Sequence, residues 1–389
     1  MGWPTLRLDE VAEVAAGNPA PQEPSDFADN GSLFIRMQDV GRWHHTSNLT
    51  DSTDRVSADA ISKHRLRLFR AGSVLIPKSG ASVNLNHRAM LGCDAYVVSH
   101  LAVIVPDRSK LLPEYLYLWS LSYDPRSQAQ TTSLPSLPLS LIKAATMQVP
   151  PLPEQRHIVD LLSRAEGIVR LRREAEKKAA ELIPALFLDM FGDPTTNPKG
   201  WDIKPLHTVA EVGSGNGFPN AYQGKTEGAY PFYKVSDMNT KGNEVEMIVA
   251  NNYISEDDLA ALRAKTFPAG TVIFPKIGAA IATNKKRVLT RPSCFDNNVM
   301  GITPSDGLNP AFLHALMMSK DISDFASDSN PPSMRKTTVE AWEIPVPPLH
   351  MQVEFGKQVE AIRSIQSQQS AATAKARVTF DALLAQAFS

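Results

Sequence analysis

Apolar residues recur at helical spacing through a long stretch in the middle of the chain, residues 150–191. After an opening proline cluster, apolar side chains such as Ile158, Leu162 and Val169 fall on one face of a helix, and charged residues lie between them. About 34 helical residues at roughly 1.5 Å each would span about 50 Å. The pattern therefore predicts one long amphipathic helix, which Pro184 should kink or end early because proline cannot donate the helical hydrogen bond.

The same pattern returns at the C-terminus. The sequence PPLHMQ at residues 347–352 repeats PPLPEQ at residues 150–155, and apolar residues then follow in step to the end of the chain. The simplest interpretation is that the two apolar stripes pair with each other, but two antiparallel helices leave much of each surface uncovered. We therefore expect partner helices to bind here as well. The positions expected to bind them are Gln155, Ile158, Leu162, Gln352, Phe355 and Val359.

The stretches in front of the two helices also repeat one design. Residues 71–78 (AGSVLIPK) align with residues 269–276 (AGTVIFPK), and residues 8–14 align with residues 206–212 at the same offset. Both stretches mix short apolar strands with turn signals, which predicts an α+β fold rather than a helical bundle. We expect two pseudo-repeated globular domains separated by two long antiparallel helices that form a coiled coil. The expected parts are a first domain at 1–149, a long helix at 150–191, a linker at 192–200, a second domain at 201–346 and a long helix at 347–389.

Composition and charge narrow the functional classes. The net charge is −1, so a nucleic-acid ligand would have to be bound by a local basic patch and not by the field of the whole chain. We expect a soluble, cytoplasmic protein with no membrane partner, because the sequence has neither a membrane-length apolar run nor an apolar signal region at its start. Cys93 and Cys294 have no partners at ligand spacing, so we expect both to stay reduced and no metal to be bound.

Three short motifs resemble parts of enzymes, and each is incomplete. Residues 330–333 read NPPS, but an adenine methyltransferase would need an aromatic residue in the fourth position and a glycine-rich cofactor turn upstream. Residues 224–226 read GKT, but Pro219 occupies the place of the first glycine of a phosphate-binding loop, and residues 213–217 lack the last spacing of a dinucleotide fingerprint. We therefore expect a non-catalytic chain without a cofactor of its own. A self-contained DNA methyltransferase and a duplicated scaffold that binds only protein are the alternatives.

Candidate binding residues gather in two kinds of segment. In each half a lysine ends a strand and is followed by glycine and a polar, basic tip, and a second polar loop precedes each long helix. Lysine, arginine and backbone amides there could hold phosphates, while asparagine and arginine could read base edges. A solvated hairpin is the alternative interpretation of each copy. The residues expected to face DNA are Lys78, Asn86, His87, Arg88, Gln128, Gln130, Thr131, Lys276, Asn284, Lys285, Lys286, Arg287, Asn330 and Arg335.

In their order and duplication, these motifs resemble the specificity subunits of type I restriction-modification systems. The resemblance covers the whole chain. It is carried by Trp-x4-Leu-x2-Val-Ala at the start, Pro-Lys-x-Gly in each half, Pro-Pro-Leu-x-x-Gln before each long helix and the Phe-Gly-Asp-Pro link at residues 191–194. The Gly-x-Thr-Pro run common in that family appears here only as Gly-Asn-Pro at residues 17–19 and Gly-Asn-Gly at residues 215–217.

The resemblance implies a role and a set of partners. Each globular half would be a target-recognition domain that reads one half of a bipartite, asymmetric double-stranded DNA sequence, and the coiled coil would set the spacer. Two modification subunits would supply S-adenosylmethionine and adenine-N6 methylation. Two restriction subunits would use ATP and Mg for translocation and cleavage, so catalysis would lie in the partners.

Overall fold

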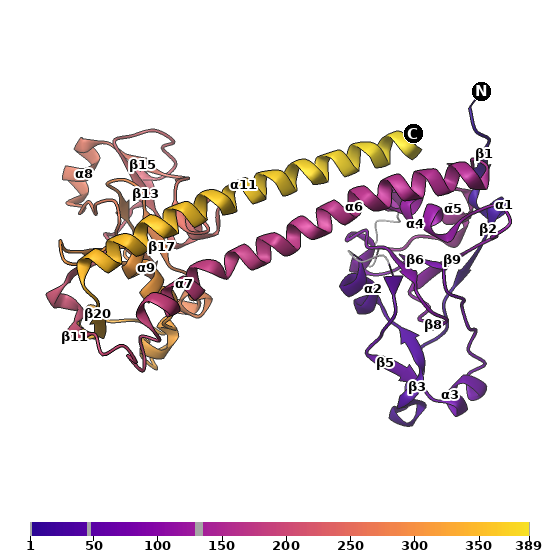
Figure 1. Ribbon diagram of the computed structural model, residues 1–389, viewed down its shortest axis with the longest axis horizontal. Coiled ribbons are helices and arrows are strands. Elements are labelled where there is room, and N and C mark those ends of the chain that lie inside the picture. The colour runs from indigo at the N-terminus through magenta and orange to yellow at the C-terminus, as the bar shows by residue number, and fades with distance from the viewer. Residues whose placement is uncertain (1, 45–47, 129–134, 389) are drawn as a thin grey trace. The chain divides into compact units, whose positions relative to one another are not determined.

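The computed structural model describes residues 2–44, 48–128 and 135–388 (Figure 1). The chain divides into two compact units. The first comprises residues 1–173 with 371–389, and the second comprises residues 174–370. Each unit therefore contains one globular part together with a portion of both long helices. No helix in the described ranges is long and apolar enough to cross a membrane.

The first unit contains three sheets with short helices between their strands. Its main sheet has five strands in the order β2-β9-β6-β7-β4, antiparallel except for the β4–β7 pair. These strands are β2 (Ala12–Ala16), β9 (Leu101–Pro106), β6 (Val74–Pro77), β7 (Ala89–Leu91) and β4 (Asn48–Leu49). The other strands are β1 (Thr5–Arg7) with β10 (Thr146–Gln148), and β5 (Asp54–Val56), β3 (Phe27–Ile35) and β8 (Tyr96–Val97). The helices are α1 (Leu8–Val11), α2 (Met37–Trp43), α3 (Ala58–Lys63), α4 (Pro113–Ser122) and α5 (Leu139–Ala144).

The second unit repeats this arrangement strand for strand. Its main sheet has the order β12-β19-β16-β17-β14, and its smaller sheets have the orders β15-β13-β18 and β11-β20. The main strands are β12 (Ala210–Ser214), β19 (Val299–Pro304), β16 (Val272–Pro275), β17 (Arg287–Leu289) and β14 (Glu246–Met247). The other strands are β15 (Tyr253–Ile254), β13 (Tyr230–Tyr233), β18 (Cys294–Phe295), β11 (Asp202–Pro205) and β20 (Glu343–Val346). The short helices are α8 (Glu256–Leu262), α9 (Pro310–Met318) and α10 (Lys336–Glu340). The predicted α+β duplication is thereby confirmed.

Successive side chains of the central strands point into two different cores, which explains why these strands are continuous apolar runs in the sequence. In the first unit, Val74 and Ile76 belong to the core shared with α4 and the long helices, whereas Leu75 lies in the core shared with the three-stranded sheet. In the second unit, Val272 and Phe274 face the core that includes α9, and Ile273 faces the opposite one. A hydrophobic core covers both faces of each main sheet, so the side chains on both sides of these central strands are apolar.

The long helices form as expected, with one break. The first comprises α6 (Leu152–Ala180) and α7 (Leu182–Phe191), and the second is α11 (Leu349–Phe388). The break precedes Pro184 by one turn because proline cannot donate a hydrogen bond to the carbonyl four residues earlier, so the predicted interruption is confirmed. The helices lie side by side and antiparallel in each unit (Figure 1), and the Gln366 side chain donates a 2.7 Å hydrogen bond to the carbonyl of Ala179.

The six residues predicted to bind partner helices are instead buried within the chain itself. Ile158 is 8% exposed and Leu162 is fully buried against the first unit's core, while Phe355 and Val359 are buried in the second. The prediction is corrected for a simple reason: an apolar stripe at helical spacing covers its own core first. The apolar residues that the long helices leave exposed lie on other faces. They are Leu161, Ile168, Leu171, Leu182, Leu188, Leu349, Val353, Ile365 and Val378.

The two glutamines of the repeated proline motif tie each long helix to its globular part. Gln155 accepts a hydrogen bond from the amide of Leu112 at 2.9 Å and donates to the carbonyls of Lys110 and Pro150, both at 2.8 Å. Gln352 makes the equivalent bonds in the second unit, accepting from the amide of Asn309 at 2.9 Å. Both side chains are fully buried. The repeated motif is therefore a structural joint between each long helix and its globular part.

Candidate nucleic-acid interface

The Pro-Lys-x-Gly segment of the second unit is joined directly to the polar loop before the last long helix. The amide of Gly278 donates to the carbonyl of Pro332 at 2.8 Å, and the amide of Met334 donates to the carbonyl of Lys276 at 2.8 Å. A β-bridge pairs Ile277 with Ser333. Gly278 adopts φ 75°, a conformation that glycine reaches without strain. Sequence reasoning placed these two segments at DNA separately, and the fold brings them together.

The first unit makes the same join. The amide of Gly80, at φ 78°, donates to the carbonyl of Pro135 at 2.9 Å, and the amide of Leu137 donates to the carbonyl of Lys78 at 2.8 Å. Ser79 and Ser136 form the equivalent β-bridge. We call these two regions the Lys78 junction and the Lys276 junction.

Different side chains surround the two lysines on this common backbone. At the Lys276 junction the lysine ammonium donates to the hydroxyl of Ser214 at 3.1 Å, and its partial burial lowers its pKa below the ordinary value. Asp296 lies nearby and is 7% exposed, and burial raises the pKa of its carboxyl group. The backbone amide of Asn298 donates to the Asp296 carboxylate at 3.0 Å. The ammonium keeps donors free of partners in the described structure, so it can bind an anionic or acceptor group.

The corresponding positions of the first unit carry other chemistry. Ala16, Val98 and His100 stand where the second unit has serine, aspartate and asparagine. The Ser79 hydroxyl lies 2.7 Å from Nδ1 of His100, and the amide of Lys78 donates to the carbonyl of His100 at 3.0 Å. The two junctions thus share a scaffold made of backbone hydrogen bonds and present unlike side chains on it.

Several residues predicted to face DNA are engaged inside the fold. Arg88 and Lys286 are each only 1% exposed, so the prediction that they face DNA is wrong. Their partners are backbone carbonyls and the side-chain oxygens of Asn86 and Asn284. Sequence reasoning missed this because a basic residue in a polar segment looks exposed, whereas the carbonyls that hold it come from a distant helix.

The remaining predicted residues occupy the rim of the junctions or adjoining loops. His87 is half-buried and stacks on His44 with ring centroids 4.7 Å apart. Lys285 donates to the side chain of Asn239, and Arg287 donates to the carbonyls of Lys286 and Met238. The exposed predicted residues in the second unit are Asn330 and Arg335. Gln128 ends a 3₁₀ helix, Pro125–Gln128, and the predictions for Gln130 and Thr131 fall outside the described residues.

A pair of asparagines that sequence reasoning did not select also recurs at both sites. Asn18 accepts a hydrogen bond from the amide of Arg67 at 2.6 Å, and Asn216 accepts one from the amide of Lys265 at 2.9 Å. The preceding glycines pass so close to the neighbouring strand that a Cβ would lie about 2 Å from a backbone oxygen. The signal was available, because the dipeptide Gly-Asn stands at matching positions in both halves.

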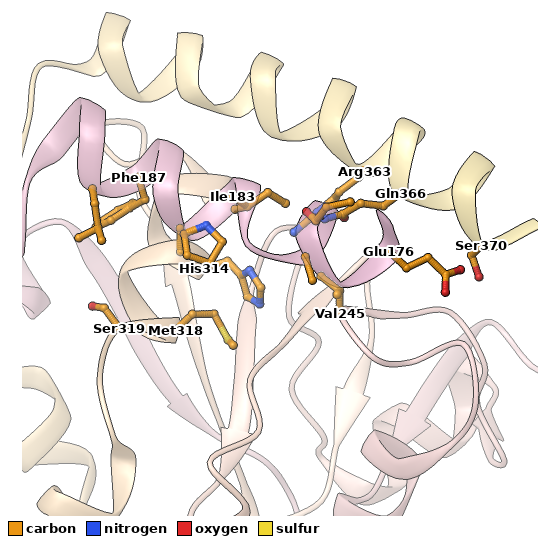
Figure 2. Close-up of a pocket in the computed structure, with 15 residues that line it drawn as sticks. Glu176, Ile183, Phe187, Val245, His314, Met318, Ser319, Arg363, Gln366 and Ser370 are labelled. Atoms are coloured by element: carbon orange, nitrogen blue, oxygen red, sulfur yellow. The ribbon is translucent and has the colours of Figure 1, made fainter. Parts of the chain in front are cut away.

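A half-open, mainly apolar cavity of about 640 Å³ lies in the second unit between α7, α9 and α11 (Figure 2). Its lining includes Phe187, Met318, His314 and Arg363. Burial lowers the pKa of His314 to about 4, so its imidazole is neutral at pH 7. The Nη1 atom of Arg363 donates to Glu246 at 2.8 Å, and its Nε atom and Nε2 of His314 are buried without partners in the described structure.

A family model described as the type I restriction modification DNA specificity domain matches residues 1–181 and 198–372. The chain belongs to this family. The chain is therefore a type I restriction-modification specificity subunit, and its role is DNA sequence recognition. The two matched stretches correspond to the two halves of the duplicated architecture. Among the described residues, no cluster of side chains could hold a metal ion.

Two relatives named as type I restriction enzyme specificity subunits are similar to this chain over most of its length. The type I restriction enzyme MjaIX specificity subunit of Methanocaldococcus jannaschii is 22% identical, with 92% of this chain and 86% of the relative covered. The MjaVIII specificity subunit of the same organism is 21% identical over 69% of this chain and 68% of the relative.

Two solved structures share the fold. A chain from a study of complex assembly and conformational transition of the type I R-M system has a TM-score of 0.65 at 19% identity, with 99% of this chain and 97% of that chain covered. The type I restriction-modification S subunit from M. genitalium has a TM-score of 0.57 at 14% identity, with 100% and 96% covered. These likenesses confirm the fold that the sequence predicted.

Proposed function

We propose that this chain is the non-catalytic reader of a bipartite DNA target, with one half-site read at the Lys78 junction and the other at the Lys276 junction. The observation that carries the proposal is the pairing of a repeated backbone scaffold with unlike side chains. The exposed His100 stands where the other unit has the half-buried Asn298, and behind them the buried Val98 stands where the other unit has the buried Asp296. A duplicated scaffold that bound two identical sequences would gain nothing from this difference, whereas two readers of different half-sites require it.

Within each junction, some residues are suited to contacts with DNA phosphates and others to contacts with bases. Lys78 and Lys276 are the groups best placed for phosphate, because each ends a strand beside an open loop. The exposed residues of the neighbouring loop, such as Asn330 and Arg335, are suited to base edges or to further phosphates. With a net charge of −1 on the whole chain, affinity has to come from such local contacts.

The long helices are proposed to bind two modification subunits through the apolar side chains they leave exposed. Leu161, Ile168 and Leu171 lie on α6, and Ile365 and Val378 lie on α11, each at least 48% exposed. In this proposal the modification subunits supply S-adenosylmethionine and adenine-N6 methylation. Two restriction subunits supply ATP- and Mg-dependent translocation and cleavage.

Reconstitution tests this function directly. The purified chain is mixed with the modification subunit of its own system and S-adenosylmethionine, and methylated adenines are mapped on genomic DNA. We expect a bipartite motif with two different halves and a fixed spacer, and no methylation by the chain alone.

The alternatives predict other outcomes. Methylation by the isolated chain would identify it as a self-contained methyltransferase. A complex that assembles but neither binds nor methylates DNA would favour the protein-only scaffold.

A further inference from the structure

The two buried cations, Arg88 and Lys286, occupy equivalent places in the repeat. Each lies in the hairpin that begins with Pro-Lys-x-Gly, close to the start of β7 or β17. Within the described part of the chain, neither forms an ion pair with a carboxylate. A charge buried to this extent is costly unless hydrogen bonds satisfy it, so its partners show what it does.

Both cations bind the same two features. The ammonium of Lys286 donates to the side chain of Asn284 and to the carbonyl of Lys320, both at 2.6 Å. The guanidinium of Arg88 donates to the side chain of Asn86 at 2.6 Å and to the carbonyl of Tyr123 at 3.1 Å.

The geometry around these bonds is shared as well. Both asparagines adopt φ 51°, a left-handed conformation that asparagine tolerates better than most residues. Tyr123 and Lys320 lie at or just beyond the C-termini of α4 and α9, where the helix dipole favours a positive charge. We call each arrangement a cation clamp.

Each clamp joins the hairpin tip to the segment that follows α4 or α9. In the second unit this segment begins with the 3₁₀ helix Ile322–Phe325, and the amide of Ile322 donates to Asn284 at 3.0 Å. In the first unit the corresponding 3₁₀ helix begins with Pro125, which has no N–H to donate. Arg88 makes an additional bond there, from Nε to the carbonyl of Ser120 at 3.1 Å. Two different side-chain chemistries thus make the same connection.

We propose that Arg88 and Lys286 are positioning residues for DNA recognition, each holding its hairpin tip at a fixed distance from the segment that follows α4 or α9. The β-bridge at the base of each junction supplies one attachment of the hairpin, and the clamp supplies a second. This inference rests on the proposed function, because it assumes that these loops contact DNA.

The test compares Lys286→Met, Lys286→Arg and Arg88→Met in the complex reconstituted with the modification subunit. Lys204→Met, on exposed β11, is the matched control. Methylated adenines are mapped for each variant, and discrimination between correct and single-mismatch targets is measured for each half of the motif. Melting temperature and complex assembly are recorded alongside.

We expect Lys286→Met to lose discrimination in one half of the motif by roughly tenfold, the scale of one mismatched base pair, while the other half is kept. Arg88→Met should affect the opposite half. Lys286→Arg should restore discrimination, because the first unit already uses arginine in this place, and Lys204→Met should behave as the wild type.

Unchanged discrimination in a folded, assembled Lys286→Met complex would overturn the inference, as would an equal loss in both halves. If Lys286→Met does not assemble, Asn284→Gly provides the decision: it keeps the left-handed backbone and removes the clamp's side-chain acceptor. A loss of discrimination confined to one half of the DNA motif then supports the inference, and unchanged discrimination overturns it. A wild-type complex without a bipartite motif would refute the proposed function, an outcome distinct from these.

Discussion

At the scale of single residues, the sequence indicated where the functional segments lie better than it indicated which side chains are exposed. The Pro-Lys-x-Gly repeats marked both junctions, because glycine and proline report backbone needs that are local. Arg88 and Lys286 were assigned to the surface, because the carbonyls of Tyr123 and Lys320 that bind them lie more than thirty residues later in the chain, just after α4 and α9. Hydrogen-bond partners that are distant in sequence leave no local signal.

One residue-scale prediction concerns pH and His314. Burial, together with the positive charge of nearby Arg363, lowers its pKa from 6.5 to about 4. Between these two values the unfolded chain binds more protons than the folded chain, so the free energy of unfolding falls as the pH falls from 6.5 to 4. The full loss is about 3 kcal/mol.

Urea unfolding of the intact chain at pH 7 and pH 4.5 measures this effect. A His314→Gln variant should lose less stability between these pH values than the wild type, with carboxyl groups accounting for the remainder in both proteins. Equal losses in the two proteins would show that His314 does not carry the effect.

At the scale of elements, helical spacing predicted both long helices and the interruption near Pro184. It did not reveal which face of each helix the chain covers for itself. Strand order was also hidden, because β16 pairs with β17 and β19 through contacts that no local pattern encodes. The duplication helped more than any single motif, since it required both halves to adopt one fold.

The hydrogen bonds of Gln352 lead to a prediction about how strongly the last long helix stabilises the second unit. Gln352→Ala removes three hydrogen bonds and leaves the buried amide of Asn309 without its partner, so the second unit should lose about 3 kcal/mol of stability. Gln368→Ala, on the exposed face of the same helix, is the control and should be neutral. Denaturant unfolding followed by tryptophan fluorescence measures both. Similar destabilisation by the two variants would contradict the structural role proposed for Gln352.

The exposed helix faces give a second prediction at this scale. Leu171→Glu and Ile365→Glu should weaken assembly with the modification subunit by at least tenfold, because each places a charge in an apolar contact surface. Their melting temperatures should stay near that of the wild type, since both side chains are at least half exposed. Analytical ultracentrifugation of the mixed subunits measures assembly, and undiminished assembly of both variants would place the partner elsewhere.

At the scale of the whole molecule, charge and duplication together limit how DNA can be bound. A net charge of −1 gives no general attraction to phosphate, so each contributing lysine should be visible in the salt dependence of binding. Sequence reasoning reached this conclusion from composition alone. The fold adds that the two lysines proposed to contact phosphate, Lys78 and Lys276, lie at two equivalent junctions.

Lys276→Met in the reconstituted complex should therefore reduce the slope of log affinity against log salt by about 0.9, the contribution of one phosphate contact. Lys204→Met should leave the slope unchanged. Fluorescence anisotropy with a labelled target duplex over a series of salt concentrations supplies the measurement. A slope unaltered by Lys276→Met would remove this lysine from the phosphate contacts.

The assembly of the first unit from the two ends of the chain bears on how the protein is made. Phe380 and Leu384 of the final helix are buried in the core that contains Tyr115 and Leu162. The ribosome must therefore synthesise residues 371–389 before the first unit can close, whereas residues 174–370, which form the second unit, have all been synthesised earlier. A chain that lacks residues 371–389 would leave an apolar face of the first unit open to aggregation and to quality-control proteases. Only finished subunits would then be available for assembly.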